Sequence, residues 1–368
     1  MSVQRAPSHA ESTICGMHGS SQQWLLAAAK PSREDLRLAR RKLHAKATFI
    51  MALNAAAYYG LVLSSWSWPM RVLSAVLLTQ SLTATATGIM HDGNHHAFSS
   101  RRWLNGLAAY SADALGASST MWRRQHNDKH HRHTNIKGFD GDLNQEPFAR
   151  LAPWQQHRSY HALQHIYMWP LYGALAMKWF VMGDFKTLLS SDHGKASLRD
   201  WASVLAGKAF HASWALILPM VMWSWKVVIP SYLAISFVVG FSLALTFQLA
   251  HCVDEADFVA EDVPHLKKND AVLHQLATTV DVHPRTRLGR AYVRFLCGGL
   301  EYQVEHHLMP RTPHTFYPTL AARLQQVCDE HGIRRRVFDS VPQAIASHQR
   351  HLRSMGRANS AQTEFARV

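Results

Sequence analysis

The segment VVIPSYLAISFVVGFSLALTFQLA, residues 227–250, contains no Asp, Glu, Lys or Arg and ends directly before His251. A helix that crosses the hydrocarbon core of a membrane needs about 20 predominantly apolar residues. Three further windows also lack these four residue types: 47–70, 72–90 and 209–225. Arg71 and Lys226 divide the windows into two pairs. The sequence therefore predicts an all-α integral membrane protein with four transmembrane helices in two hairpins.

The mean hydropathy of the whole chain is −0.16, but membrane insertion depends on local apolar runs rather than on the average. We expect the first hairpin to turn at Trp66, Trp68 and Pro69, and the second at Lys226 and Pro230. Segments 91–208 and 251–368 carry most of the Lys and Arg, whereas the two short turns carry only Arg71 and Lys226. Because cytoplasmic loops carry the excess of positive charge, both hairpins should return the chain to the cytoplasm. The expected location is a bacterial inner membrane or its equivalent.

Three regions follow from these windows. Residues 1–30 lack strong periodicity and a signal-peptide pattern, so we expect a disordered tail. Residues 31–320 should form the membrane domain, with a helical cap on the cytoplasmic side that carries the histidine clusters. Residues 321–368 should form a basic helical tail. The weaker apolar stretches 103–122 and 166–183 are expected to be interfacial or buried helices rather than spans.

Histidine is the unusual feature of the composition, because the chain contains 25 His and only 4 Cys, which show no close pairing. A CxxC metal site, an iron–sulfur cluster and a disulfide framework are therefore not predicted. The formal net charge of +14 indicates an anionic partner. No nucleic-acid recognition motif accompanies this charge, so we expect anionic lipid or an acidic redox protein, and no nucleic acid.

Three histidine clusters and one single histidine carry the candidate chemistry. They are HDGNHH (91–96), HNDKHHRH (126–133), QVEHHLMP (303–310) and His251. Residues three or four apart share one face of a helix. His91 with His95 can therefore point at one ion, and so can His126 with His130, while His131 can reach a second ion. Gln303 has the same spacing to the pair that follows it, His306 and His307.

The ligand type and number narrow the choice of metal. Imidazole suits zinc, copper, iron and nickel, and the absence of a thiolate cluster disfavours copper(I). A zinc hydrolase needs three or four ligands, whereas about eight imidazoles suit a pair of irons that activates O2. Carboxylates beside the clusters are expected to orient imidazole N–H groups: Asp92, Asp128, Asp142, Asp254 and Glu305. Five further histidines are weaker ligand candidates: His96, His133, His265, His274 and His314.

With these clusters in place, the chain resembles the membrane fatty acid desaturase family, in the branch whose last histidine box reads Gln-x-x-His-His. The resemblance covers about residues 45–320 and rests on five motifs: HDGNHHAFS (91–99), WRRQHNDKHHRHTNIKGFDGDL (122–143), FQLAH (247–251), HQLATTVD (274–281) and GGLEYQVEHHLMPRTPHTFYP (298–318). The chain departs from the family pattern at His96, Glu301 and Met309. These departures leave the histidine set intact but leave the acyl substrate and the position of attack open.

The resemblance implies an enzyme with two non-haem irons and O2 as co-substrate, which places a double bond in an acyl chain. It implies the ligands His91, His95, His126, His130, His131, His251, His306 and His307. Gln303 stands where relatives outside this branch have His, and it is expected to be a weak ligand or to hold a water. The His-Pro-Gly-Gly motif of a fused cytochrome b5 is absent from the sequence. An external electron donor such as ferredoxin is therefore expected.

An unactivated CH2 group has no acidic proton, so side-chain acid–base catalysis cannot remove its hydrogens. We therefore expect the metal centre to do the chemistry and the protein to supply an apolar tunnel among the spans. A related hydroxylase or acetylenase would use the same histidines. A membrane metal-binding protein would need charged residues within the spans, which the four windows lack. Whether the acyl chain is bound to a lipid, to coenzyme A or to acyl carrier protein stays open.

Overall fold

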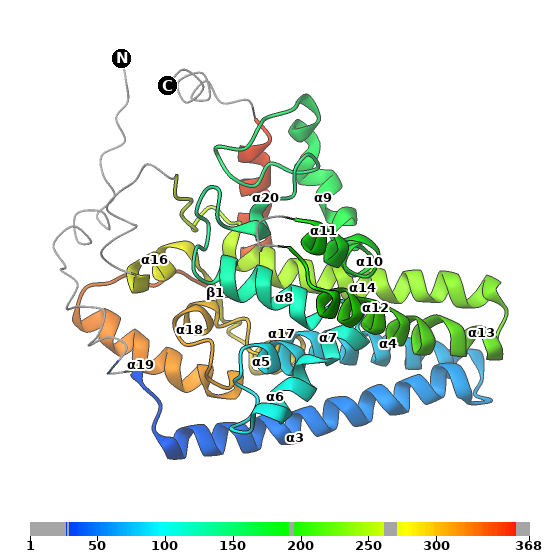
Figure 1. Ribbon diagram of the computed structural model, residues 1–368. Helices are drawn as coiled ribbons and strands as arrows, with labels where there is room; N and C mark the ends of the chain where they lie inside the picture. Colours follow the sequence, from blue (N-terminus) through cyan, green and yellow to red (C-terminus); the bar gives the residue numbers. More distant parts are fainter. Residues whose placement is uncertain (1–26, 28, 191–194, 261–270, 358–368) are drawn as a thin grey trace.

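The structure, a computed structural model, describes residues 27, 29–190, 195–260 and 271–357 (Figure 1). The predicted disordered tail thus lies almost entirely outside the described residues. The described chain is mostly helical, and four of its helices are long and apolar enough to cross a membrane. They cover Arg33–Leu63, Trp68–Asn94, Leu198–Met222 and Trp225–His251. The prediction of four spanning helices is confirmed at this level.

Three of the four long helices begin at a serine whose side chain accepts a free backbone N–H group, and the fourth, α4, begins with a proline in its first turn. Ser32 and Asp35 form a capping box at the start of α3 (Arg33–Tyr58), which continues as the π-helix η1 (Tyr59–Leu63). Ser67 and Pro69 begin α4 (Trp68–Ala84), which runs through the π-helix η2 (Thr85–Met90) into α5 (His91–Asn94). The charged run before the first apolar window therefore belongs to the same helix as that window.

The second pair of long helices has the same form. Ser197 and Asp200 form a capping box at α12 (Leu198–Ala212), which continues through η8 (Ser213–Ile217) into α13 (Leu218–Met222). Ser224 caps α14 (Trp225–His251). The expected turn at Pro230 is wrong, because the chain turns at Trp223 and Ser224 and Pro230 lies inside α14. A proline so near a helix start removes a backbone bond that affects only the first turns.

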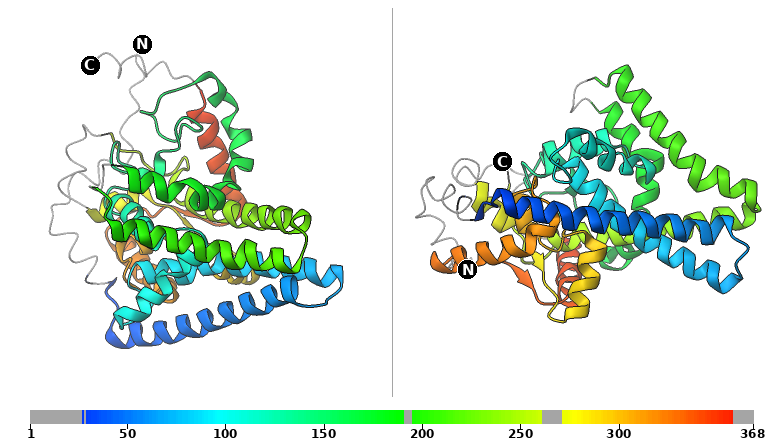
Figure 2. Two further views of the ribbon diagram at one scale, coloured as in Figure 1. Left: turned by 45° about the vertical axis from the view of Figure 1, so that its right-hand side comes forward. Right: turned by 90° about the horizontal axis from the view of Figure 1, so that it is seen from below.

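In Figure 1 the four long helices extend to the right, and most of the other elements gather around their left ends. Figure 2 shows the same separation from two further sides. The stretch 103–122 is divided into three short helices: α6 (Arg102–Ala109), α7 (Ser111–Ala114) and α8 (Ser119–Gln125). The stretch 166–183 lies in α9 (Gln164–Tyr172), α10 (Leu175–Lys178) and η6 (Trp179–Gly183), followed by α11 (Asp184–Leu189). Neither stretch is a candidate span.

The C-terminal part of the described chain packs into the core rather than extending from it. It comprises α16 (Ala271–Thr278), β1 (Asp281–Val282), α17 (Arg287–Cys297), α18 (Gln303–Leu308), η9 (His314–Phe316), α19 (Tyr317–Glu330), β2 (Val337–Phe338) and α20 (Val341–Met355). Leu320 and Leu324 of α19 share a buried cluster with Val304 of α18. Strand β2 pairs in parallel with β1. The predicted boundary at residue 320 therefore falls inside a packed helix.

Candidate metal centre

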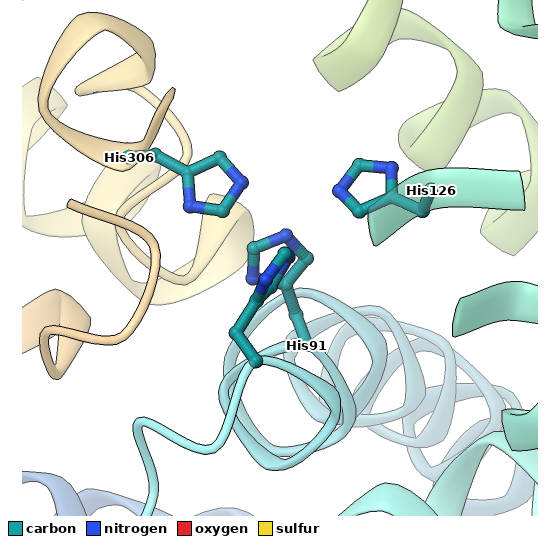
Figure 3. A group of neighbouring side chains, drawn as sticks. His91, His126 and His306 are labelled. Carbon is teal, nitrogen blue, oxygen red and sulfur yellow. The ribbon is translucent and has the colours of Figure 1, made fainter. Parts of the chain in front are cut away.

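The three histidine clusters and His251 meet at the left end of the long helices, where their ring nitrogens form two buried groups. One group contains His91, His95, His126 and His306, and the other contains His130, His251 and His307. Within each group the candidate ligand atoms lie within 4.8 Å of one another. Figure 3 shows the rings of His91, His126 and His306 directed toward a common space. His131 lies between the groups, with its ring centroid 4.5 Å from His306 and 4.3 Å from His307.

The second cluster has a different local structure from the expected α-helix. Residues His126–His130 form a π-helix, η3. A π-helix has a wider turn than an α-helix, so residues four apart no longer point in the same direction. His126 and His130 therefore fall into different buried groups. The two share a group only with Asp142, on the more exposed side of the site. The prediction that His126 and His130 can point at one ion therefore fits only the group that includes Asp142, and each histidine also belongs to a different buried group.

In several of these histidines, one ring nitrogen is in hydrogen-bond contact with another residue of the protein. The other ring nitrogen is then directed at the centre of the site. The Nδ1–H of His130 donates to both oxygens of Asp140, at 3.1 Å each. His307 Nδ1 lies 2.9 Å from Gln275 Oε1, and His306 Nδ1 lies 3.2 Å from the Tyr317 hydroxyl. His251 Nδ1 lies 3.3 Å from the carbonyl oxygen of Thr278. Partners of this kind fix the tautomer and the orientation of metal-binding imidazoles.

The nitrogens that face the centre show that the site fits metal ions. Nε2 of His91, His95, His306 and His307 is buried and has no hydrogen-bond partner among the described residues. Nε2 of His126 and Nε2 of His131 face each other at 3.1 Å. A buried polar atom without a partner costs about 1–3 kcal/mol. Several such atoms around one space are therefore explained by cations that they bind together.

Burial also sets the charge of these rings. Burial, followed by the repulsion of neighbouring imidazoles, lowers the pKa well below 6.5 for His95, His126, His131, His306 and His307. At neutral pH these five rings are uncharged, which is the form that binds metals. His130 differs: burial alone would lower its pKa, but Asp140 and Asp142 raise it to about 9.

Gln303 lies at the second group. Its Nε2 is 2.9 Å from His251 Nε2, and its Oε1 is buried without a partner. The assignment of amide oxygen and nitrogen rests on the hydrogen-bond network. With the amide rotated by half a turn, the oxygen of Gln303 and the nitrogen of His251 would face one point as two acceptors. Gln303 is therefore placed where a ligand, or a side chain that holds a water, would lie.

The carboxylates beside the clusters have different roles from those expected. Asp142 lies 3.7 Å from His126 Nδ1 and 3.6 Å from His130 Nδ1, so it is near the imidazoles as predicted. Asp92 Oδ1 is 4.0 Å from His91 Nδ1, and its other oxygen binds His314. Asp128 is exposed, so its predicted role beside a buried imidazole is wrong.

Glu305 and Asp254 also differ from expectation, because each forms an ion pair with an arginine: Glu305 with Arg335 at 2.5 Å and Asp254 with Arg350 at 2.9 Å. The residue that the sequence analysis missed is Asp140, which holds His130. It stands two positions before Asp142 in the Gly138–Asp142 run, and that run was the available signal.

The weaker candidates lie outside the two buried groups. His96 is exposed and has φ 59°, and His133 stacks on Phe139 with ring centroids 4.9 Å apart. His274 is buried, and neither ring nitrogen has a partner among the described residues. His314 binds Asp92 rather than the centre. His265 lies outside the described residues.

An apolar cavity of about 420 Å³ lies among the long helices. Its lining includes Val62 and Leu78 from the first pair of helices, and Trp214 and Val239 from the second pair. Val239 packs in the same buried cluster as Trp122. The Trp122 ring in turn stacks on His126, with centroids 4.2 Å apart. Apolar side chains therefore fill the space between the cavity and the histidines, and the predicted tunnel stays a prediction.

Comparison with known proteins agrees with this geometry. The profile of the family described as "Fatty acid desaturase" matches residues 66–339. The chain is 32% identical to the sn-1 linoleoyl-lipid 6-desaturase of Arthrospira platensis, over 83% of this chain and 85% of that protein. It is 30% identical to the sn-1 linoleoyl-lipid 6-desaturase of Synechocystis sp., over 79% and 82% of the two chains. It is 32% identical to the acyl-lipid (8-3)-desaturase of Physcomitrium patens, over 84% of this chain and 66% of that protein.

The four long apolar helices, the histidine groups and these matches together define a membrane protein with the chemistry of an acyl-chain oxidoreductase. The chain belongs to the fatty acid desaturase family. Its activity is that of a fatty acyl desaturase.

Proposed function

We propose that the chain is an O2-dependent desaturase in which two non-haem iron ions are held by His91, His95, His126, His130, His131, His251, His306 and His307. The observation that carries the proposal is the meeting of these eight imidazoles, several with unpartnered Nε2 atoms: seven form two adjoining buried groups, and His131 lies between the groups. Gln303 completes the second group as a weak ligand or through a water. Asp92, Asp140 and Asp142 support the imidazoles from outside.

The reaction converts –CH2–CH2– with O2, two electrons and two protons into –CH=CH– and two waters. Iron bound at the two groups supplies the oxidising power that an unactivated C–H bond needs, which no side chain here can supply. The histidines bind and orient the metal. Trp122 and the apolar residues around it exclude water and hold the acyl chain beside His126. Regiochemistry follows from how deep the chain lies in the cavity relative to the histidines.

We infer that the substrate is an acyl chain bound to a membrane lipid. The names of the relatives specify linoleoyl-lipid or acyl-lipid substrates, and coenzyme A or acyl carrier protein is the alternative carrier. The mostly apolar wall of the cavity and its position among the long helices fit a chain that enters from the bilayer. Chain length and the bond attacked depend on the closed end of this cavity.

The four long helices are proposed to cross the membrane as two hairpins, with the histidine-bearing elements as a cap on the cytoplasmic face of a bacterial inner membrane. Arg71 and Lys226 are the basic residues near the two turns, whereas the cap carries most of the Lys and Arg. This distribution is the positive-inside pattern. An external carrier such as ferredoxin is the proposed electron donor, because an acidic protein would be attracted to the basic cap.

The same centre fits a second outcome, because small differences in substrate placement decide between a double bond, a triple bond and a hydroxyl group. Mass spectrometry separates hydroxylation from the other two outcomes: an alcohol gains about 16 mass units, whereas a new double or triple bond loses about 2. The family match and the names of the relatives favour desaturation.

The test is expression in a bacterial host supplied with polyunsaturated fatty acids, followed by fatty acid profiling. We expect a new unsaturated chain with the wild type and none with H130A. H133A is the matched control, because His133 lies in the same cluster but outside both buried groups. A new product that persists in H130A, or that is lost equally in H133A, would contradict the proposed site.

A further inference from the structure

Lys46 is the last residue of the charged run in α3, directly before the apolar window 47–70, and its ammonium group is directed into the protein. Its Nζ donates to the carbonyl oxygen of Arg294 at 2.8 Å and lies 3.1 Å from His314 Nε2. An ammonium group can only donate hydrogen bonds, so His314 Nε2 must accept. The remaining ring proton of His314 is then on Nδ1.

That proton is directed at the first histidine cluster. His314 Nδ1 lies 3.0 Å from Asp92 Oδ2, and the backbone N–H of His314 donates to the same oxygen at 3.1 Å. Both side chains are 1% exposed. The other oxygen of Asp92 lies 4.0 Å from His91 Nδ1. Lys46, His314 and Asp92 thus form a continuous buried chain that ends beside a proposed metal ligand.

The position of the His314 ring is fixed by the backbone around it. A side chain at Gly88 would bring its Cβ within 3.3 Å of His314 Cε1. A Cβ at Gly299, which has φ +89°, would lie 2.5 Å from the Cβ of His314. Glycine at both positions therefore provides the slot in which the ring lies. Such a slot between the second span and the loop after α17 favours one ring position.

We propose that Lys46 and His314 are positioning residues for the first metal group, acting on His91 through Asp92. The inference rests on the proposed di-iron function. Lys46 fixes the tautomer of His314, the Nδ1–H of His314 fixes the Asp92 carboxylate, and the other oxygen of Asp92 places a negative charge 4.0 Å from Nδ1 of His91. Removal of a residue that supports a metal-binding histidine in this way typically lowers the metal affinity about 10–100-fold.

The alternative is that Lys46 only ties α3 to α17 through the carbonyl oxygen of Arg294. In that case its removal would lower the stability of the fold but leave iron binding unchanged once the protein is folded. The two roles are separated by measuring iron release and thermal unfolding of the metal-free protein on the same preparations.

The experiment compares wild type with K46M, H314F and the double variant, all reconstituted with iron. Met keeps the length of the lysine side chain, and Phe keeps a ring for the slot beside Gly88 and Gly299. K42M is the matched control, because Lys42 lies one helical turn earlier and is exposed. The readouts are iron per chain and the rate of iron release to a chelator.

In K46M and in H314F, the rate of iron release to the chelator should be about 10-fold higher than in wild type or K42M. About half of the iron should show this faster release, because the two residues act on the first metal group only. The double variant should release it no faster than H314F alone, because Lys46 acts through His314. Release at the K42M rate, or effects that multiply in the double variant, would overturn the inference. If K46M does not fold, H314F decides alone: iron release at the wild-type rate overturns the inference. Wild type that binds no iron would instead contradict the proposed function.

Discussion

Replacement of Arg335 by Met tests how the third histidine cluster is held in place. Arg335 lies between Asp281 and Glu305, with an ion pair of 2.5 Å to each, and both carboxylates are 0% exposed. Asp281 also accepts the backbone N–H of Val304, which is one of the free N–H groups at the start of α18. Burial and the neighbouring Asp281 raise the pKa of Glu305 well above 4.5, so Arg335 compensates one buried negative charge in a pair of carboxyl groups that support the helix carrying His306 and His307.

The expected effect of R335M is large because it leaves both carboxylates buried without a cation. Breaking a buried ion pair in this way costs about 3–5 kcal/mol. An unfolding entropy of about 2.1 cal/mol/K per residue converts a loss of about 4 kcal/mol into a fall of about 5 °C in the melting temperature. R334M is the matched control, because Arg334 is the exposed neighbour. Its melting temperature should stay within about 1 °C of wild type, as expected for a surface substitution.

The assay is thermal unfolding of the metal-free protein in detergent, so that iron binding does not contribute. The double variant R335M/D281N should recover about 2 kcal/mol relative to R335M, because the amide removes the uncompensated charge of Asp281. A melting temperature for R335M equal to that of R334M would refute the reasoning. So would a double variant that is less stable than R335M.

Three further outcomes are expected. D140N should release iron about 10–100-fold faster than wild type to a chelator, because His130 loses its anionic acceptor, while D254N, on the surface ion pair, should not. A75W, which fills part of the cavity lining, should shift the product profile toward shorter acyl chains, as measured by gas chromatography; an unchanged profile would contradict the assigned cavity. Burial lowers the pKa of His348 to about 4, even though the carbonyl oxygen of Cys252 opposes the shift. Below about pH 6.5 the unfolded chain binds a proton at His348 that the folded chain does not bind until about pH 4. This histidine should therefore lower the stability of wild type by about 3 kcal/mol between pH 6.5 and 4. Unfolding scans of H348N should show a smaller loss over the same pH range.

The parts of the fold that were predictable are those set by local sequence. Four charge-free windows were enough to find the long helices, because a spanning helix must satisfy its backbone within the segment. Their ends were predicted less well. The turn was placed at Pro230, yet Ser224 caps α14 and the proline is tolerated near the helix start. Apolar periodicity carries no information about such caps.

The candidate site was predictable in its members but not in their arrangement. The spacing of His126 and His130 indicated one shared ion, whereas the π-helix separates them into two groups. Glu305 was expected beside an imidazole because it is adjacent to His306, but it pairs with Arg335, 30 residues further along the chain. Partners such as Asp140, Gln275 and Tyr317 come from tertiary packing, so no local pattern identified all of them.

The central claim is that eight histidines from four separate segments bind two iron ions. The most direct measurement is the metal content of the purified protein by mass spectrometry, after reconstitution with iron under anaerobic conditions. The account predicts two iron atoms per chain in wild type. A content of one iron or none, or a protein that retains zinc and excludes iron, would contradict it.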